Sequence, residues 1–172
     1  MKISTWNVNS VKARLSNLLI WLRNFAPDVV LLQETKTVDE AFPRMQIEDA
    51  GYSVSMHGQK TYNGVAILSK STIEDVTCGL PGDISDEQAR YMEGTVFGNV
   101  RVATIYLPNG NPIEGEKFAY KLAWMDRLYR HVQDCLDTNE TYVFGGDYNV
   151  IPNDNDVYNP KAFARDALTQ PE

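Results

Sequence analysis

The sequence has few of the residues that build zinc sites and disulfide frameworks. Among 172 residues there are two cysteines and two histidines. Cys78 and Cys135 lie far apart and match no zinc-binding spacing, and nothing in the pattern supports a long-range disulfide between them. Reduced thiols are therefore expected, as in a cytoplasmic protein.

Long apolar runs and a leader-like beginning are also missing. No stretch approaches the ~20 apolar residues that a membrane-spanning helix needs. The sequence starts MKISTWNVNS, in which no basic region is followed by an apolar stretch. These absences predict a cytoplasmic protein with no membrane partner.

Positive charge is scarce as well. Lys and Arg total 16 against 23 Asp and Glu, for a net charge of −7. This balance weighs against broad, charge-driven binding of nucleic acid, because phosphate contacts need local Lys and Arg. A small basic patch, or a cation bridging protein and phosphate, is still compatible with it. With 43% apolar residues, residues 1–172 suffice for a single domain with a buried core.

Apolar runs of strand length dominate the pattern. The segments 28–33 and 65–69 are apolar almost throughout, which predicts strands buried on both faces. Residues 91–97 and 100–107 read as a hairpin with Gly98-Asn99 as a two-residue turn. Further strands are predicted at 2–6, 52–56, 73–77 and 142–146.

Helical periodicity predicts fewer helices than strands. Ser10 is a suitable N-cap for a helix that ends before Pro27, and shorter helices are expected at 42–50 and 162–168. The longest helix spans 116–136, and its predicted apolar stripe is Phe118, Leu122, Met125, Tyr129, Val132 and Leu136. Within it, Trp124 reads as core or its rim and His131 as solvated. About three helices can cover one sheet face, so the other face must meet something else, such as a second sheet.

Polar residues stand where predicted strands end. Asn7, Glu34, Tyr106 and Asp147 each follow or close such a run. Active sites commonly gather at the carboxyl ends of strands, on loops held by the sheet. Taken singly, an Asp or Asn after a strand is more often a turn former or helix cap. The recurrence at several strand ends favours a shared site.

The chemistry of these side chains points to a hard cation. Asn7, Glu34, Asp147 and Asn149 offer only oxygen donors, which suit Mg²⁺ or Mn²⁺ better than Zn²⁺. A cation at Glu34 could neutralise a phosphate oxygen, while Asp147 orients or deprotonates a water. Asn149 could donate to a phosphoryl oxygen, and Tyr106 could exchange a proton near it.

Five motifs in order give the sequence a family resemblance. TWNVNS, LLQETK, NGVAILSK, YLPNG and GGDYNV resemble the exonuclease III family, the DNA-repair branch of the endonuclease/exonuclease/phosphatase superfamily. The resemblance includes SDEQAR and DVYNP and extends along essentially the whole chain. Lys36 and YLPNG favour this branch over the lipid and inositol phosphatases.

The resemblance implies a fold, an activity and a set of roles. The fold is a four-layer α/β sandwich, with helices outside two facing mixed sheets. The activity is Mg²⁺-dependent hydrolysis of double-stranded DNA, 5′ of abasic sites and from 3′ ends. Asn7 and Glu34 resemble metal-site residues, Tyr106 the active-site tyrosine, Asp147 the proton acceptor or donor, and Asn149 the group that stabilises the transition state. DNA contacts are expected in the loops GQKTYNG and SDEQAR, with Lys60, Arg90 and Asn109 as candidates.

The resemblance covers the N-terminal two-thirds of family members. Their remaining part carries an Asp in an Arg-Ile-Asp segment and a C-terminal Asp-His pair, and nothing after Asn149 matches either. We therefore expect this chain to be impaired alone, and to self-associate or pair with the missing C-terminal portion, which would supply most of the second sheet. The alternatives are a phosphatase or phosphodiesterase of the same superfamily, and an inactive assembly or binding fragment.

Overall fold

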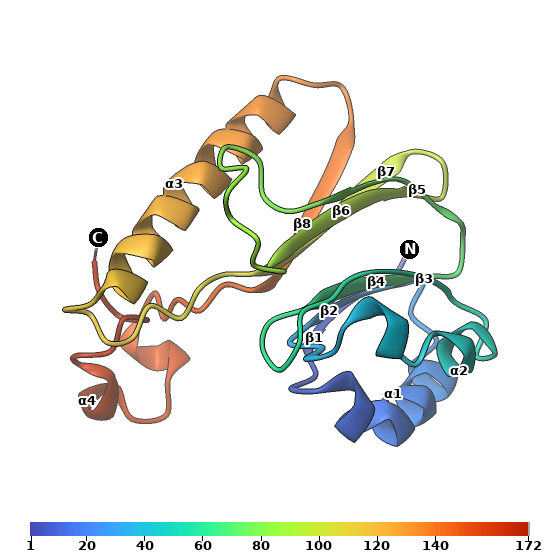
Figure 1. Cartoon of the computed structure of the whole chain (residues 1–172), viewed down its shortest axis with the longest axis horizontal. Helices are drawn as coiled ribbons and strands as arrows, with labels where there is room; N and C mark the ends of the chain where they lie inside the picture. Colours follow the sequence, from blue (N-terminus) through green and yellow to red (C-terminus); the bar gives the residue numbers. More distant parts are fainter. Residues whose placement is uncertain (172) are drawn as a thin grey trace.

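The apolar runs of the sequence become the inner strands of two four-stranded sheets that face each other (Figure 1). The computed structural model describes residues 1–171. The first sheet has the order β1-β2-β4-β3, with β1 (Ile3–Asn7) parallel to β2 (Val29–Gln33). Both β4 (Val65–Ser69) and β3 (Ser53–His57) run antiparallel to their neighbours.

The second sheet has the order β5-β6-β7-β8. It begins with β5 (Ile73–Cys78), β6 (Tyr91–Val96) and β7 (Val100–Tyr106), which pair antiparallel, and ends with β8 (Thr141–Asp147), which pairs parallel with β7. Val96 pairs with Val100, so three residues form the hairpin loop, and Phe97 and Gly98 have positive φ there. The predicted hairpin is confirmed, but its predicted two-residue turn is wrong.

The core between the sheets shows which face each strand presents. Val29, Leu31, Val65 and Ile67 of the first sheet pack with Met92, Val96 and Val102 of the second. The alternate residues of β2 and β4 point away from the second sheet, toward α1 (Val11–Phe25) and α2 (Arg44–Glu48). Every residue of β2 and β4 is buried, as predicted for strands covered on both faces.

This packing corrects one expectation about the uncovered sheet face. The second sheet was expected to come largely from outside the chain, yet β5 to β8 build four strands of it. The sequence pattern identified the hairpin of residues 91–107 but not that it belongs to the second sheet. The alternation of apolar residues along a strand shows that one face is buried, but not which other element packs against that face. The apolar inner faces of the two sheets therefore cover each other within residues 1–171. Self-association was expected because one of these faces would be exposed, and no such exposed inner face is present among these residues.

The outer face of the second sheet is covered by α3 (Glu116–Leu136), whose ends match the prediction (Figure 1). Its buried residues are Lys121, Trp124, Leu128 and Cys135. The predicted stripe is right in part: Met125 and Val132 pack against the core beneath α3, but Tyr129 is 65% exposed and Leu136 71% exposed.

The buried face of α3 includes polar side chains that find partners beneath it. Nε2 of His131 lies 2.9 Å from Oη of Tyr91 and 3.2 Å from Oε2 of Glu93. The prediction of a solvated His131 is therefore also wrong. A stripe of apolar residues alone could not locate a face that contains a lysine and a histidine.

Short elements complete the chain. A 3₁₀ turn, η1 (Asp39–Ala41), precedes α2, and η2 (Asp154–Asp156) and α4 (Pro160–Phe163) follow β8. The helix predicted at 162–168 is thus shorter and earlier. Ser10 caps α1 as predicted, because its Oγ accepts a hydrogen bond from N of Ala13. Among residues 1–171, no helix is both long and apolar enough to cross a membrane.

Candidate active site

The carboxyl ends of two parallel strand pairs, one from each sheet, meet at the candidate site. Asn7 closes β1 and Asp147 closes β8, while Glu34 directly follows β2. Nδ2 of Asn7 donates to Oε1 of Glu34 at 2.8 Å and to Oδ2 of Asp147 at 2.8 Å. One amide therefore joins two carboxylates that come from different sheets.

The backbone after β2 is held in an unusual conformation. Glu34 and Lys36 have φ values of 53° and 52°, in the left-handed region that non-glycine residues rarely adopt. Neighbouring loops hold it there, because Ser10 N donates to Glu34 O at 2.7 Å and Lys36 N donates to Asn63 O at 3.0 Å. Such conformations persist only where surrounding structure imposes them, and they cluster at functional sites.

The Glu34 carboxylate is kept charged by its neighbours. Nζ of Lys36 lies 2.7 Å from Oε2 of Glu34 and donates to Oδ1 of Asn9 at 2.6 Å. Burial alone would raise the pKa of Glu34, but the hydrogen bonds from Asn7 and Lys36 outweigh burial and hold that pKa below its usual value. The site therefore presents an ionised carboxylate at neutral pH.

Tyr106 lies beside this carboxylate, on the strand next to Asp147. It pairs in register with Asp147 across β7 and β8. Burial, and then the negative charge of Glu34, raise the pKa of Tyr106, so its phenol keeps its proton. The guanidinium of Arg90 lies 4.9 Å from the centre of the Tyr106 ring, a cation–π contact that fixes both side chains.

Two glycines allow β8 to bring Asp147 into place. A Cβ on Gly146 would lie 2.0 Å from the carbonyl oxygen of Ile105, and one on Gly145 would lie 2.8 Å from Cδ1 of Leu31. Glycine is therefore required at position 146, where a side chain would meet the backbone of β7, while a side chain at position 145 would force Leu31 of the first sheet to shift. The sequence GGD places a carboxylate at the end of a strand that packs unusually tightly.

Asn149 is held by several hydrogen bonds just beyond Asp147. Its N–H donates to Oδ1 of Asp147 at 3.1 Å, and its Nδ2 donates to the carbonyl of Leu107 at 2.8 Å. Its φ of 46° again lies in the left-handed region. The loop after β8 thus orders Asn149 relative to Asp147.

Two surface hollows adjoin these residues. One, of about 340 Å³, is lined by Thr5, Asn7, Gln33, Gly146, Asp147, Tyr148, Asn149, Val150 and Leu168. The other, of about 460 Å³, is lined by Glu34, Lys36, Gln59, Tyr62, Asn63, Gln88, Arg90, Tyr106 and Lys117. Together they contain every predicted catalytic and metal-site residue.

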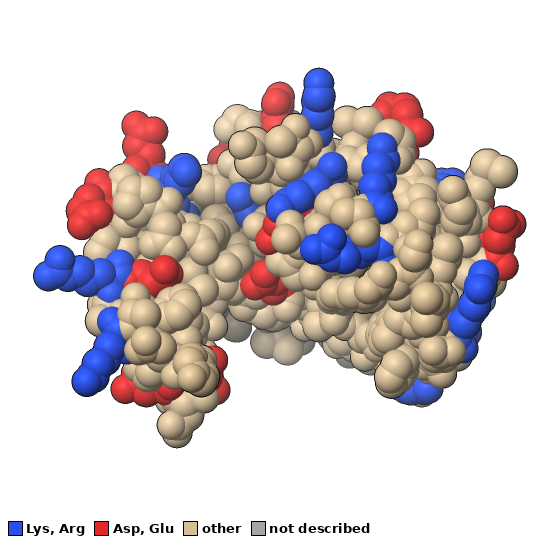
Figure 2. All heavy atoms as spheres, turned by 90° about the horizontal axis from the view of Figure 1, so that it is seen from below, with Lys and Arg blue, Asp and Glu red and all other residues tan. Residues whose placement is uncertain are grey.

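The predicted DNA contacts are placed less uniformly. Arg90 lines the second hollow. Lys60 is exposed on the loop before β4, next to Gln59, which lines the same hollow. Asn109 is exposed on the loop after β7 but lines neither hollow, and its Oδ1 accepts hydrogen bonds from Asn111. In Figure 2, basic and acidic side chains are interspersed over the face seen from below, consistent with local phosphate contacts on an acidic body.

Other residues of the site were not named individually as functional candidates. Lys36 was noted only as a mark of the family branch, and its ion pair with Glu34 depends on the left-handed backbone of both residues, which the sequence does not reveal. The amide side chains of Gln59 and Gln88 both interact with Asn63, which orders the loop wall of the second hollow. Lys117 also lines this hollow. Gln59, Asn63 and Gln88 lie in the loops GQKTYNG and SDEQAR, where the family resemblance led us to expect DNA contacts, although no single one of them was named. No periodicity or spacing marks them individually, or Lys117.

The donor set can be compared with what a hard cation requires. Among residues 1–171, no group of three or more His, Cys, Asp and Glu side chains is placed to hold a metal ion. Mg²⁺, however, is commonly bound by one or two carboxylates together with water and substrate phosphate. Glu34 and Asp147, joined through Asn7, meet that requirement. The amide oxygen of Asn7 accepts from N of Asn9, so Asn7 acts here as a bridge between carboxylates.

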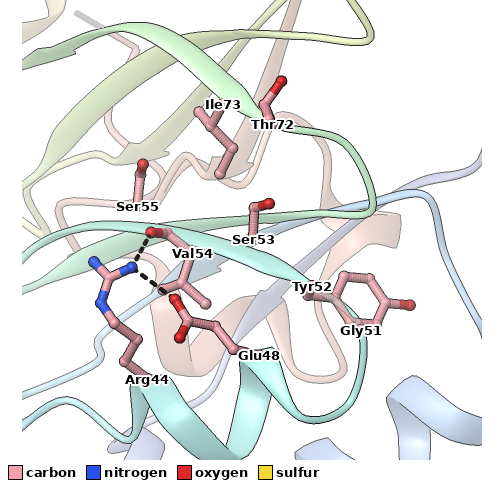
Figure 3. Close-up of a pocket in the computed structure, with 9 residues that line it drawn as sticks. All are labelled: Arg44, Glu48, Gly51, Tyr52, Ser53, Val54, Ser55, Thr72 and Ile73. Atoms are coloured by element: carbon pink, nitrogen blue, oxygen red, sulfur yellow. Dashed lines mark hydrogen bonds and ion pairs between the residues drawn. The ribbon is translucent and has the colours of Figure 1, made fainter.

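A further hollow, of about 510 Å³, lies elsewhere, where β3 and the segment entering β5 approach each other (Figure 3). Arg44 there donates to the carbonyl of Val54 at 2.7 Å and pairs with Glu48. Ser53, Ser55 and Thr72 add hydroxyl groups. Arg44 satisfies an edge-strand carbonyl, and the lining contains none of the predicted site residues.

The chain belongs to the endonuclease/exonuclease/phosphatase family, whose model matches residues 4–171. It is 35% identical over 161 residues to exodeoxyribonuclease III of Haemophilus influenzae, covering 91% of this chain and 60% of that protein. The resemblance to exonuclease III proteins is confirmed.

Solved structures confirm the α/β fold. An AP endonuclease from Archaeoglobus fulgidus matches with a TM-score of 0.93 and 37% identity, over 99% of this chain and 66% of that one. A 3′ phosphatase, NExo from Neisseria bound to product DNA hairpin, matches with a TM-score of 0.90 and 40% identity, over 95% of this chain and 63% of that one. The chain thus spans less than two-thirds of the length of each of these proteins.

Proposed function

We propose that this protein is a Mg²⁺-dependent DNA-repair nuclease, with Mn²⁺ as an alternative cation, that cleaves DNA 5′ of abasic sites and removes nucleotides from 3′ ends. The observation that carries the proposal is the Asn7 amide joining Glu34 and Asp147 at 2.8 Å each. Two carboxylates so close together, with a protonated phenol beside them, suit hydrolysis of a phosphodiester.

Each side chain has a role in that reaction. Glu34 and Asp147 would hold the cation, which supplies positive charge to the phosphate and to the leaving oxygen. Asp147 orients the attacking water and accepts its proton. Tyr106 keeps its proton at neutral pH and can donate a hydrogen bond to a phosphoryl oxygen. Asn149 has a second Nδ2–H beyond the one given to Leu107, and it can donate that to the same phosphate.

The hollow beside Glu34 would receive the DNA backbone. Lys36, Arg90 and Lys117 are the basic side chains in its lining, and Lys36 pairs with Glu34. Lys60 stands on the adjoining loop. Contacts of this kind position the duplex without reading its sequence, which suits an enzyme that acts on damage or on ends.

A second candidate function is removal of phosphate from DNA 3′ ends. The 40% identity to the 3′ phosphatase NExo favours it. The same groups would serve, because a phosphomonoester at a 3′ end also needs charge neutralisation and an oriented water. A 3′ phosphate lies at the end of a strand and an abasic site lies within it, so the two functions can be measured separately with two different substrates.

The test compares substrates under one set of conditions. The purified protein is incubated with a duplex containing an abasic site, a duplex with a recessed 3′ hydroxyl, a hairpin with a 3′ phosphate, and a phosphoinositide. Mg²⁺, Mn²⁺ and a chelator are compared. Cleavage at the abasic site or loss of 3′ nucleotides, abolished by the chelator, is the expected result.

Other outcomes would favour the alternatives. Release of phosphate only from the hairpin would support the 3′ phosphatase function. Hydrolysis of the phosphoinositide alone would place the protein among phosphatases of small or lipid substrates. DNA binding without hydrolysis of any substrate would favour an assembly or binding role. That result would agree with the expectation that the chain needs the catalytic groups of the C-terminal family motifs, which nothing after Asn149 matches.

A further inference from the structure

One buried lysine connects the loops that carry the candidate site. Lys121, on α3, is 2% exposed. Its Nζ donates to the carbonyl oxygens of Asn149 at 2.8 Å, Ala167 at 2.8 Å and Asn109 at 3.3 Å. These carbonyls belong to three separate segments, which follow β7, β8 and α4. All three protons of the ammonium group are therefore used.

A lysine in this place needs an explanation. Burying an ammonium group is costly, and no ion pair of Lys121 is found among the described residues. An apolar side chain at this position could fill the same space beneath α3 as the aliphatic part of Lys121. The three carbonyls, in contrast, would lose a common donor. The position is therefore explained by the loops that converge on it.

The surrounding loops are closely fitted to the lysine. A Cβ on Gly110 would lie 2.7 Å from Cδ of Lys121 and 3.1 Å from Cβ of Ala167. Ala167 N donates to Oδ1 of Asn111 at 3.0 Å, which joins the loop after β7 to the C-terminal segment. Ile151 N donates to Leu168 O at 2.7 Å, which joins the loop after β8 to the same segment. The lysine lies where these links converge.

The link from Lys121 reaches the candidate catalytic groups through the backbone of Asn149. The N–H of Asn149 donates to Asp147, and its side chain donates to Leu107. Its carbonyl is the remaining backbone group, and Lys121 holds it. We propose that Lys121 is a positioning residue, whose ammonium group fixes the carbonyl of Asn149 and so aims the side chain of Asn149 at the phosphate. This inference rests on the proposed function.

The test is a double-mutant cycle in the whole protein. Lys121→Met removes the donors and keeps a long side chain. We expect kcat to fall ~10²-fold with KM within ~3-fold, because small misplacement of reacting groups has effects of this size. In the Asn149→Ala background, the same substitution should lower kcat by less than about 3-fold, because the group it positions is gone. Arg130→Met, which removes an exposed charge of α3, is the matched control.

The cycle separates positioning from general support of the fold. An equal fall in kcat in both backgrounds, or no fall in either, would overturn the proposal. If Lys121→Met does not fold, the cycle is run with Lys121→Arg, which keeps the charge but cannot donate to three carbonyls from one atom. The same two outcomes would again overturn the proposal.

A structural measurement distinguishes failure of this proposal from failure of the proposed function. Should the wild-type protein hydrolyse no DNA, the proposed function fails. The side-chain amide resonance of Asn149 then tests the positioning role. It should shift in the folded Lys121 variant and stay in place in Arg130→Met. An unchanged resonance in the Lys121 variant would overturn the proposal whatever the activity.

Discussion

The bridge made by Asn7 offers the most direct test of the candidate site. Asn7→Ala removes the donor that serves Glu34 and Asp147 together, while β1 keeps its backbone hydrogen bonds to β2. The two carboxylates then face each other without a shared partner. We expect turnover to fall while DNA binding is largely kept.

The magnitude follows from the two hydrogen bonds. Each joins a neutral donor to a charged acceptor, an interaction of roughly 1.5–3 kcal/mol. The side chain of Glu34 is 19% exposed, so water can replace part of this interaction. A net loss of about 1–3 kcal/mol in the transition state corresponds to a fall in kcat of roughly 5- to 150-fold.

The same substitution should change the pH dependence in a defined direction. The hydrogen bond from Asn7 is one of the interactions that lower the pKa of Glu34. Its loss should raise that pKa, so Glu34 would gain its proton at a higher pH. The acidic limb of the profile of kcat against pH should therefore move to higher pH.

The assay combines single-turnover cleavage of an abasic duplex with DNA binding by fluorescence anisotropy, across a range of pH. Asn17→Ala is the control, because Asn17 is an exposed residue of α1 with the same side chain. An Asn7→Ala protein with unchanged kcat and an unmoved acidic limb would refute the bridging role. Equal losses of binding and turnover would instead assign Asn7 to DNA binding.

Further predictions concern the carboxylates and the close packing. Glu34→Gln should raise the Mg²⁺ concentration needed for half-maximal activity by roughly 10-fold or more, and an unchanged Mg²⁺ titration would remove Glu34 from the metal site. Asp147→Asn should lower kcat by ~10²-fold or more with DNA affinity kept; a matching loss of affinity would make its role structural. Gly146→Ala should lower the unfolding temperature, because its Cβ would lie 2.0 Å from Ile105 O; an unchanged temperature would contradict this packing. Burial alone would raise the pKa of Glu93, but hydrogen bonds from His131, Tyr91 and Arg101 lower it to about 2 from 4.5. This carboxylate therefore stabilises the fold fully above pH 4.5 and loses that contribution as pH falls toward 2. Urea unfolding from pH 6 to pH 3 should show this loss, and Glu93→Gln should weaken the dependence; an identical slope in the variant would count against it.

The individual elements could be predicted closely from the sequence. The strand Val65–Ser69 and the helix Glu116–Leu136 match at both ends. Their signals are local, namely a continuous apolar run and a long helical segment between breaker-rich loops. The pairing of strands into two sheets could not be derived this way, because it depends on contacts between distant segments. The four-layer arrangement came from the family resemblance, and even then the source of the second sheet was misjudged.

The candidate site was predictable to the extent that it follows strand ends. Asn7, Glu34, Tyr106 and Asp147 each lie at or just after such an end, and parallel pairing brings the carboxyl ends of β1 and β2, and of β7 and β8, to one edge. That they touch across the two sheets required the fold. Their chemical roles are still predictions.

The buried side of α3 shows why other contributors were missed. A search for apolar stripes treats a lysine or histidine as evidence of exposure. Lys121 and His131 are nevertheless turned inward, because carbonyls and a carboxylate beneath the helix supply their partners. Those partners come from loops and strands far away in the sequence, so no window along the helix contains the signal. Sequence patterns therefore reveal least about buried polar side chains that hydrogen-bond to distant loops. Lys121 is such a side chain, because it donates directly to the backbone carbonyl of Asn149, the residue it is proposed to position.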